Sequence, residues 1–241
     1  MQRDDMPIDT VFLDAGGVLV VPNWRRVADA LRAHGVHASP GALAAADPHA
    51  RFELDVTKGK NATDQQRGWL YFNLVLEKAG VALSEGTDAA LADLQAYHAR
   101  VNLWEDVPDG VREALARMRK AGLRLVVVSN ANGRLRFLLD RLGLSPLVDA
   151  MLDSNEEGVE KPDRRLFDLA LQRSGASRES TVHAGDLYHV DVEGARGAGL
   201  RAVLIDPLGL YEGFDCERVR SLGELANRLL AGDSSTLSRE P

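Results

Sequence analysis

Short β-branched and aliphatic runs alternate with amphipathic stretches along the second half of the chain. The runs at residues 123–129, 150–152, 181–186 and 201–206 predict strands, and the apolar run at 9–14 has the same character. Helical spacing of apolar residues fits 110–121, 134–142, 164–174, 189–198 and 222–230. Strands that alternate with helices in this way predict an α/β fold, in which helices cover both faces of a parallel sheet.

Residues 21–106 follow a different pattern. They contain no convincing strand, but helical spacing over 24–34, 64–78 and 87–102. We therefore predict an all-helical insert, a core made from residues 1–20 and 107–231, and hinges near 21–23 and 106–109. The polar end of the chain, residues 232–241, is expected to be a flexible tail.

Composition and charge narrow the possible partners and the expected location. The net charge is −7 with no block of like charge, which argues against nucleic acid as the main partner. Cys216 is the only cysteine, so an intramolecular disulfide is impossible. No run approaches the roughly 18 apolar residues of a membrane span. We expect a cytoplasmic protein, a monomer or homodimer, that binds neither membrane nor nucleic acid.

Polar residues follow four of the predicted strands. Asp14 closes the first, Ser129 and Asn130 close "VVVSN", Lys161 follows the third in "EGVEKPD", and Asp186 closes "HAGD". Each alone fits a cap or a turn. Ligands of open α/β folds bind beyond the carboxyl ends of the strands, so together these residues predict one pocket.

The acidic residues predict a metal site. Asp14, Asp186 and Asp191 would repel one another at one point, and a hard divalent cation such as Mg²⁺ would neutralise them. Ser129, Asn130 and Lys161 supply a hydroxyl, an amide and a fixed positive charge. These groups suit a tetrahedral phosphoryl group, with a carboxylate nucleophile beside its phosphorus.

The same segments resemble the four motifs of the haloacid dehalogenase-like (HAD) hydrolase superfamily. "FLDAGGVL" resembles the nucleophile motif, "VVVSNANG" the second, "EKPDRRLF" the third and "GDLYHVDVEGARGAGL" the acidic fourth. One large subgroup inserts a helical cap between the first two motifs, where residues 21–106 lie here. The resemblance implies a Rossmann-like, doubly wound parallel sheet with an all-helical cap.

The resemblance also implies a role for each residue. Asp14 would attack the substrate and form an aspartyl intermediate, which water then hydrolyses. Asp14, the backbone carbonyl of Gly16 and Asp186 would hold Mg²⁺, with Asp191 in or near the same shell. Ser129 and Asn130 would bind the transferring group, and Lys161 would neutralise the developing charge. The implied activity is magnesium-dependent hydrolysis of a small phosphorylated metabolite.

Gly16 departs from the phosphatase pattern, because most phosphatases of this superfamily carry a second aspartate there as general acid and base. A phosphatase with a good leaving group remains one interpretation. A 2-haloacid dehalogenase, or a phosphonatase that uses Lys58 or Lys60 of the insert, is the second. A binding protein that retains the pocket without turnover is the third. Retention of Asp186 and Asp191 favours phosphoryl chemistry over halide release.

Two histidines flank the acidic motif and are candidates to replace the missing acid. His183 lies within a predicted buried strand, which favours a packing role, whereas His189 stands at a predicted helix start and is the better functional candidate. Trp24, Trp69 and Trp104 fall in or beside the insert and are expected to pack its helices.

Overall fold

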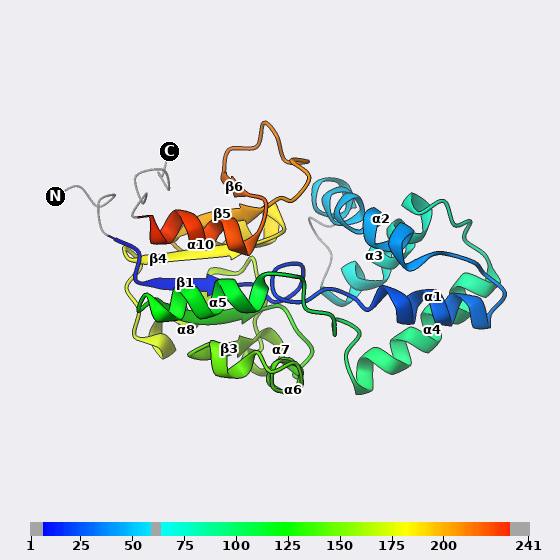
Figure 1. Ribbon diagram of the computed structural model, residues 1–241, viewed down its shortest axis with the longest axis horizontal. Helices are drawn as coiled ribbons and strands as arrows, with labels where there is room; N and C mark the ends of the chain where they lie inside the picture. The colour runs from blue at the N-terminus through cyan, green and yellow to red at the C-terminus, as the bar shows by residue number, and fades with distance from the viewer. Residues whose placement is uncertain (1–6, 59–63, 232–241) are drawn as a thin grey trace. The chain divides into compact units, whose positions relative to one another are not determined.

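The computed structural model describes residues 7–58 and 64–231 (Figure 1). The chain divides into two compact units, the first formed by Met1–Val21 with Val107–Pro241 and the second by Pro22–Asp106. We call them the sheet unit and the helical unit. The tail predicted at residues 232–241 lies outside the described residues.

The sheet unit is built on six parallel strands in the order β3-β2-β1-β4-β5-β6. The strands are β1 (Thr10–Leu13), β2 (Arg124–Ser129), β3 (Ala150–Asp153), β4 (Thr181–Gly185), β5 (Arg201–Ile205) and β6 (Glu217–Val219). β1 and β4 are buried along their whole length. Such continuous apolar runs are typical of strands covered on both faces.

Helices cover both faces of this sheet. They are α5 (Val111–Lys120), α6 (Leu135–Arg141), α7 (Ser154–Glu157), α8 (Arg164–Ser174), α9 (Glu193–Gly197) and α10 (Leu222–Leu230). Helices α5 and α10 lie side by side on the face toward the viewer in Figure 1. The chain reverses direction across the sheet after β3, so right-handed crossovers place α8 and α9 on the other face. The predicted doubly wound α/β fold is confirmed.

The register of the strands brings their carboxyl ends together. Leu13 of β1 lies opposite Val127 of β2 and Ala184 of β4, and Ser129 lies opposite Asp153 of β3. The residues that follow these strands therefore emerge at one edge of the sheet, where open α/β folds bind their ligands.

The helical unit consists of α1 (Trp24–Ala33), α2 (Pro40–Glu53), the π-helical turn η2 (Leu54–Lys58), α3 (Asp64–Lys78) and α4 (Glu85–Arg100). They enclose a separate hydrophobic core in which Trp24 and Trp104 pack against Tyr71 and Phe72, as expected for these two tryptophans. The Trp69 side chain lies outside the described part of the structure.

Several elements differ from the sequence prediction, among them α2, α9 and β6. The helix α2 was not predicted, because its alanine-rich sequence lacks a clear apolar spacing and contains Pro48 in its interior. The helix expected at 189–198 instead begins as the π-helical turn η4 (Tyr188–Val192) and continues as α9. The strand β6 has only three residues, too few to show an alternating or continuous apolar pattern.

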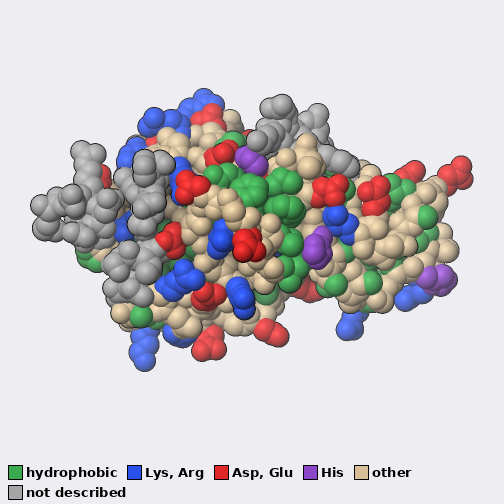
Figure 2. All heavy atoms as spheres, turned by 90° about the horizontal axis from the view of Figure 1, so that it is seen from above, with side chains coloured by type: hydrophobic (Ala, Val, Ile, Leu, Met, Phe, Trp, Pro, Cys, Tyr) green, Lys and Arg blue, Asp and Glu red, His purple; other side chains and the backbone are tan. Residues whose placement is uncertain are grey.

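The distribution of charged side chains on the surface and the apolar content of the helices bear on the predicted partners. On the face in Figure 2, acidic and basic side chains are interspersed over the described residues rather than gathered by sign. Among the helices of the described ranges, none has both the length and the apolar content that crossing a membrane requires.

Candidate active site

Lys161 joins two acidic side chains at the carboxyl edge of the sheet. Its Nζ atom lies 2.8 Å from Oδ1 of Asp14, directly after β1, and 2.6 Å from Oδ1 of Asp191 in η4. The Lys161 and Asp191 side chains are each 1% exposed, whereas that of Asp14 is 13% exposed. Asp14 is therefore the member of this trio that a ligand can reach.

Asp191 is held by donors on both of its oxygens. Oδ1 receives Lys161 Nζ and lies 2.9 Å from Nε2 of His183, while Oδ2 accepts the backbone N–H groups of Asp186 and Leu187 at 3.2 and 3.1 Å. Gly185 makes this possible, because a Cβ atom there would lie 2.1 Å from Cγ of Asp191. The carboxylate of Asp191 occupies the space that any other residue at position 185 would need.

Burial and charge set these two carboxyl groups apart. Burial raises the pKa of Asp14, and repulsion from Asp191 adds to this, against the opposing effect of Lys161. Burial also acts on Asp191, but Lys161 and His183 more than offset it and hold its pKa well below the usual range. The two acids raise the pKa of Lys161 despite its burial. Lys161 is thus a permanent cation shared unequally between two acids.

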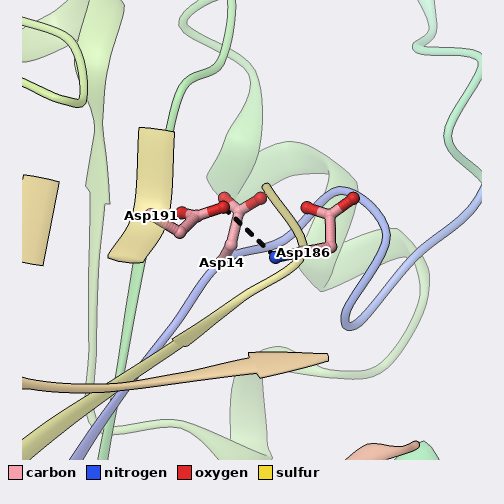
Figure 3. A group of neighbouring side chains, drawn as sticks. All are labelled: Asp14, Asp186 and Asp191. Carbon is pink, nitrogen blue, oxygen red and sulfur yellow. Dashed lines mark hydrogen bonds between the residues drawn. The ribbon is translucent and has the colours of Figure 1, made fainter. Parts of the chain in front are cut away.

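The third carboxylate completes an acidic cluster. Oxygens of Asp14, Asp186 and Asp191 all lie within 4.8 Å of one another, and Figure 3 shows the three side chains gathered at this edge. Two of these carboxylates, those of Asp14 and Asp191, share the ammonium group of Lys161, so this trio carries a formal charge of −1 when both acids are ionised. Oxygen donors with this charge fit a hard divalent cation such as Mg²⁺.

Ser129, the last residue of β2, and Asn130, which follows it, make different contacts. A hydrogen bond from the Ser129 hydroxyl favours the ionised form of Asp14 and so lowers its pKa. The Asn130 side chain instead bridges to the backbone of Lys161, with Oδ1 accepting from N–H at 2.8 Å and Nδ2 donating to the carbonyl at 3.0 Å. The predicted substrate ligand Asn130 thus fixes the loop that carries Lys161.

The two glycines after Asp14 form a tight turn. Gly17 has a φ of 75°, which is the left-handed region that glycine adopts without strain, and its N–H donates to the carbonyl of Val20 at 2.8 Å. The Ala15 carbonyl accepts from the N–H groups of Leu19 and Val20 at 2.9 and 3.0 Å. The chain therefore folds back immediately after β1 and leaves Asp14 at the edge of the sheet.

Comparison with known proteins decides the family. The sequence matches the haloacid dehalogenase-like hydrolase family over residues 8–199. The chain belongs to this family. It is therefore a HAD-like hydrolase, and the predicted resemblance is confirmed.

Relatives and solved structures agree with the assignment. The chain is 34% identical to ribulose-1,5-bisphosphate 5-phosphatase of Halopiger xanaduensis over 160 residues, 65% of each chain. It is 35% identical to phosphoserine phosphatase of Thermus thermophilus over 136 residues, 56% of this chain and 53% of that protein. The matches thus span about two thirds and one half of these relatives. The magnesium-bound HAD hydrolase YfnB of Bacillus subtilis shares the fold, with a TM-score of 0.66, 18% identity and coverage of 93% and 99%.

The contacts of the two histidines differ from those that the sequence predicted for this HAD hydrolase. His183, expected to serve packing alone, has a fully buried side chain that contacts Asp191 directly. The ring of His189 packs edge-on against Tyr188, with centroids 5.2 Å apart. A histidine in the interior of a buried strand, three positions before Asp186, was the signal in the sequence that could have pointed to His183.

Sequence reasoning also missed the residues that hold the loop after β2. Asp153, which is 2% exposed, accepts hydrogen bonds from the backbone N–H groups of Gly133 and Leu135, each at 3.1 Å. The hydroxyl of Ser154 accepts from Ala131 N–H at 3.1 Å. These contacts fix the backbone that follows Ser129. Lys60 and the Lys58 side chain, which the phosphonatase interpretation requires, lie outside the described parts of the structure.

Proposed function

We propose that the protein is a magnesium-dependent phosphatase that hydrolyses a small phosphate monoester through an aspartyl-phosphate at Asp14. The arrangement of Asp14 carries this proposal, because its carboxylate is the exposed member of a buried charge cluster and lies 2.8 Å from a permanent ammonium group. Relatives named as phosphatases of ribulose-1,5-bisphosphate and phosphoserine support phosphate monoesters as the substrate class.

The chain provides a suitable set of ligands for magnesium. We assign Asp14 and Asp186 as its carboxylate ligands, together with the backbone carbonyl of Gly16. Asp191 belongs just behind them, because four donors already occupy its two oxygens. Bound magnesium would supply positive charge beside the oxygens of the transferring phosphoryl group.

The reaction has two steps on this chain. The Asp14 carboxylate attacks phosphorus, so an oxygen–phosphorus bond forms to Asp14 as the bond to the leaving oxygen breaks. Water then attacks the same phosphorus, which releases inorganic phosphate and restores the carboxylate. The hydroxyl of Ser129 and the ammonium of Lys161 stabilise the charge on the phosphoryl oxygens in both steps. The helical unit corresponds to the family's cap, which we propose selects the substrate.

Gly16 limits the leaving groups that such an enzyme can use. A positioned general acid and base typically contributes about 10²–10⁴-fold to the rate. Without an aspartate at this position, we expect preference for esters whose leaving oxygen needs little protonation, such as sugar 1-phosphates or aryl phosphates. A 2-haloacid dehalogenase is the second candidate, because halide departure requires no proton.

The test is release of inorganic phosphate from sugar phosphates, nucleotides and p-nitrophenyl phosphate, with Mg²⁺ or with a chelator. We expect magnesium-dependent release by the native chain and its loss in Asp14→Asn. Asp140→Asn is the matched control, because Asp140 is an exposed carboxylate on α6 of the same unit. Halide from 2-chloropropionate, or acetaldehyde from phosphonoacetaldehyde, without phosphate release from any ester, would contradict the proposal.

A further inference from the structure

His183 occupies a position where an aliphatic side chain would be expected. It lies in the middle of β4 between Val182 and Ala184, and all three residues are completely buried. The edge of its ring packs against Phe167 of α8, with centroids 5.0 Å apart. Packing alone does not require an imidazole at this place, since valine or leucine would fill the strand without a polar group to satisfy.

The hydrogen bond to Asp191 defines the protonation of this ring. Burial lowers the pKa of His183, so the ring is neutral at pH 7 and carries one proton. The ionised carboxylate of Asp191 can only accept hydrogen bonds, so the proton must be on Nε2, 2.9 Å from Oδ1. Among the described residues, the buried Nδ1 atom then has no hydrogen-bond partner. Burying this ring therefore costs free energy of desolvation. The favourable polar interaction that the imidazole adds is the hydrogen bond from Nε2–H to Asp191.

The same oxygen of Asp191 connects His183 to the nucleophile. Oδ1 receives both His183 Nε2 and Lys161 Nζ, and Nζ reaches Asp14 at 2.8 Å. Backbone N–H groups hold the other oxygen. With donors on both oxygens the carboxylate cannot rotate, and a fixed carboxylate keeps the ammonium group beside Asp14. Small displacements of a group that acts on the reacting atoms are costly to rate.

We propose that His183 is a positioning residue, which orients Asp191 so that Lys161 stays directed at Asp14. The expected effect on kcat rests on the proposed function. The effect of His183 on the Lys161 ammonium group can be measured without turnover. His183 touches neither the substrate nor the reacting atoms and acts only through Asp191.

Two amide substitutions isolate the hydrogen bond. The side chain of His183→Gln can place its N–H₂ group near the position of Nε2, whereas the shorter side chain of His183→Asn cannot reach Asp191. Both variants are polar, but asparagine fills less space than glutamine by one methylene, so the loss of buried volume needs its own control. Val182→Ala removes buried volume from the same strand without touching Asp191 and controls for packing alone.

Steady-state kinetics with p-nitrophenyl phosphate and saturating Mg²⁺ provide the first measurement. We expect His183→Asn to lower kcat about 10- to 100-fold, the scale of losing an outer hydrogen-bond partner of an active-site ligand, with KM nearly unchanged. His183→Gln should recover most of that loss. In an Asp191→Asn background the two substitutions should be equivalent, because a residue that acts only through Asp191 has no further effect once it is altered.

The second measurement is the ¹⁵N resonance of the Lys161 ammonium group in protein labelled with ¹⁵N-lysine, assigned by its loss in Lys161→Met. We expect this signal to be shifted or broadened in His183→Asn and to remain near its native position in His183→Gln and Val182→Ala. A native signal in His183→Asn, or equal kcat values for the Gln and Asn variants, would overturn the inference. Absence of phosphatase activity in the native chain would reject the proposed function, while the NMR comparison would still test the positioning role.

Discussion

The two units of the protein each bury a carboxylate beside a cation, but they balance charge differently. In the helical unit, Oδ1 of Asp47 accepts from Arg51 Nε at 2.9 Å and from the Tyr71 hydroxyl at 2.6 Å, and Oδ2 accepts from Arg51 Nη2 at 3.2 Å. One carboxylate thus meets one guanidinium four residues along the same helix. In the sheet unit, the ammonium of Lys161 pairs with two carboxylates, Asp14 and Asp191, and Asp186 completes the acidic cluster beside them.

The difference supports a structural role for the Asp47 cluster and the proposed catalytic role for the cluster of Asp14, Asp186 and Asp191. A balanced, bidentate pair with a third hydrogen bond satisfies its own groups and needs no ligand. At the sheet edge, burial and repulsion from Asp191 disfavour the ionised form of Asp14, which a bound cation would stabilise. The imbalance at the sheet edge supports the proposed metal site, and the Asp47 cluster is the internal reference against which that proposal can be tested.

The largest effect is expected from Gly185→Ala. The added Cβ would lie 2.1 Å from Cγ of Asp191, so the carboxylate must leave its four donors. We expect a loss in kcat of at least about 100-fold, the typical cost of misplacing groups around reacting atoms. The control is Gly197→Ala in α9, where no atom lies within 4 Å of the added Cβ. Phosphatase assays on both variants measure the difference, and a fully active Gly185→Ala would refute the proposed role of Asp191.

Asp47→Ala should damage stability without affecting the metal site. It removes the carboxylate that accepts two N–H groups of the largely buried Arg51, and breaking a buried ion pair typically costs about 3–5 kcal/mol. Urea unfolding monitored by tryptophan fluorescence gives the free energy of unfolding. The gain in that free energy on adding Mg²⁺ should equal the native gain. A lost magnesium response in Asp47→Ala would contradict the separation of the two clusters.

Asp14→Asn and Asp191→Asn should move the stability of the metal-free protein in opposite directions. The raised pKa of Asp14 means that its charge opposes folding, by an amount that grows as pH rises from the ordinary aspartate range through the folded-state pKa. The lowered pKa of Asp191 means that its charge stabilises the fold at neutral pH, and this stability is lost as pH falls below the ordinary range.

At pH 7 with a chelator we expect Asp14→Asn to raise the melting temperature and Asp191→Asn to lower it, each by roughly 3 °C, which corresponds to about 1 kcal/mol in a chain of this size. Differential scanning calorimetry above pH 4 would show the slope that comes from Asp14, whereas the slope that comes from Asp191 lies below the ordinary aspartate range and requires scans at more acidic pH. Equal decreases in the melting temperature of the two variants would mean that Lys161 stabilises both carboxylates to the same extent.

The smallest effect is expected from Tyr71→Phe. This change removes one hydrogen bond to Asp47 but leaves both bonds from Arg51, so the cost should be about 1 kcal/mol. The ring remains to pack against Trp104 and Phe72. Thermal unfolding compared with Asp47→Ala checks this value. A loss as large as that of Asp47→Ala would show that the hydroxyl, rather than the ion pair, holds the cluster.

The sequence predicted the parts of the site that depend on strand ends. Asp14 and Asp186 directly follow a strand, Ser129 ends one, and Lys161 lies in the connection after β3. Parallel strands necessarily bring their carboxyl ends to one edge. The same argument predicted the doubly wound sheet, since buried parallel strands have an unmistakable continuous apolar pattern.

Sequence patterns did not predict which groups these side chains contact. Asn130 was predicted to bind the substrate, but its amide is directed at the Lys161 backbone, a choice that depends on how two distant loops pack. His183 belongs to a strand whose other residues are all apolar or small, and its contact with Asp191 depends on the π-helical turn of η4. Such contacts follow from tertiary packing and leave only a weak local signal.

The proposed reaction requires Asp14 to carry the phosphoryl group between its two steps. Sodium borohydride reduces an acyl phosphate to an alcohol, so reduction during turnover, followed by proteolysis and mass spectrometry, reports where phosphate was bound. We predict homoserine at position 14 in the native chain with substrate and Mg²⁺, and none when substrate is omitted or Asp14 is replaced by Asn. Phosphate release with an unreduced Asp14, or reduction at another acidic residue, would contradict the account.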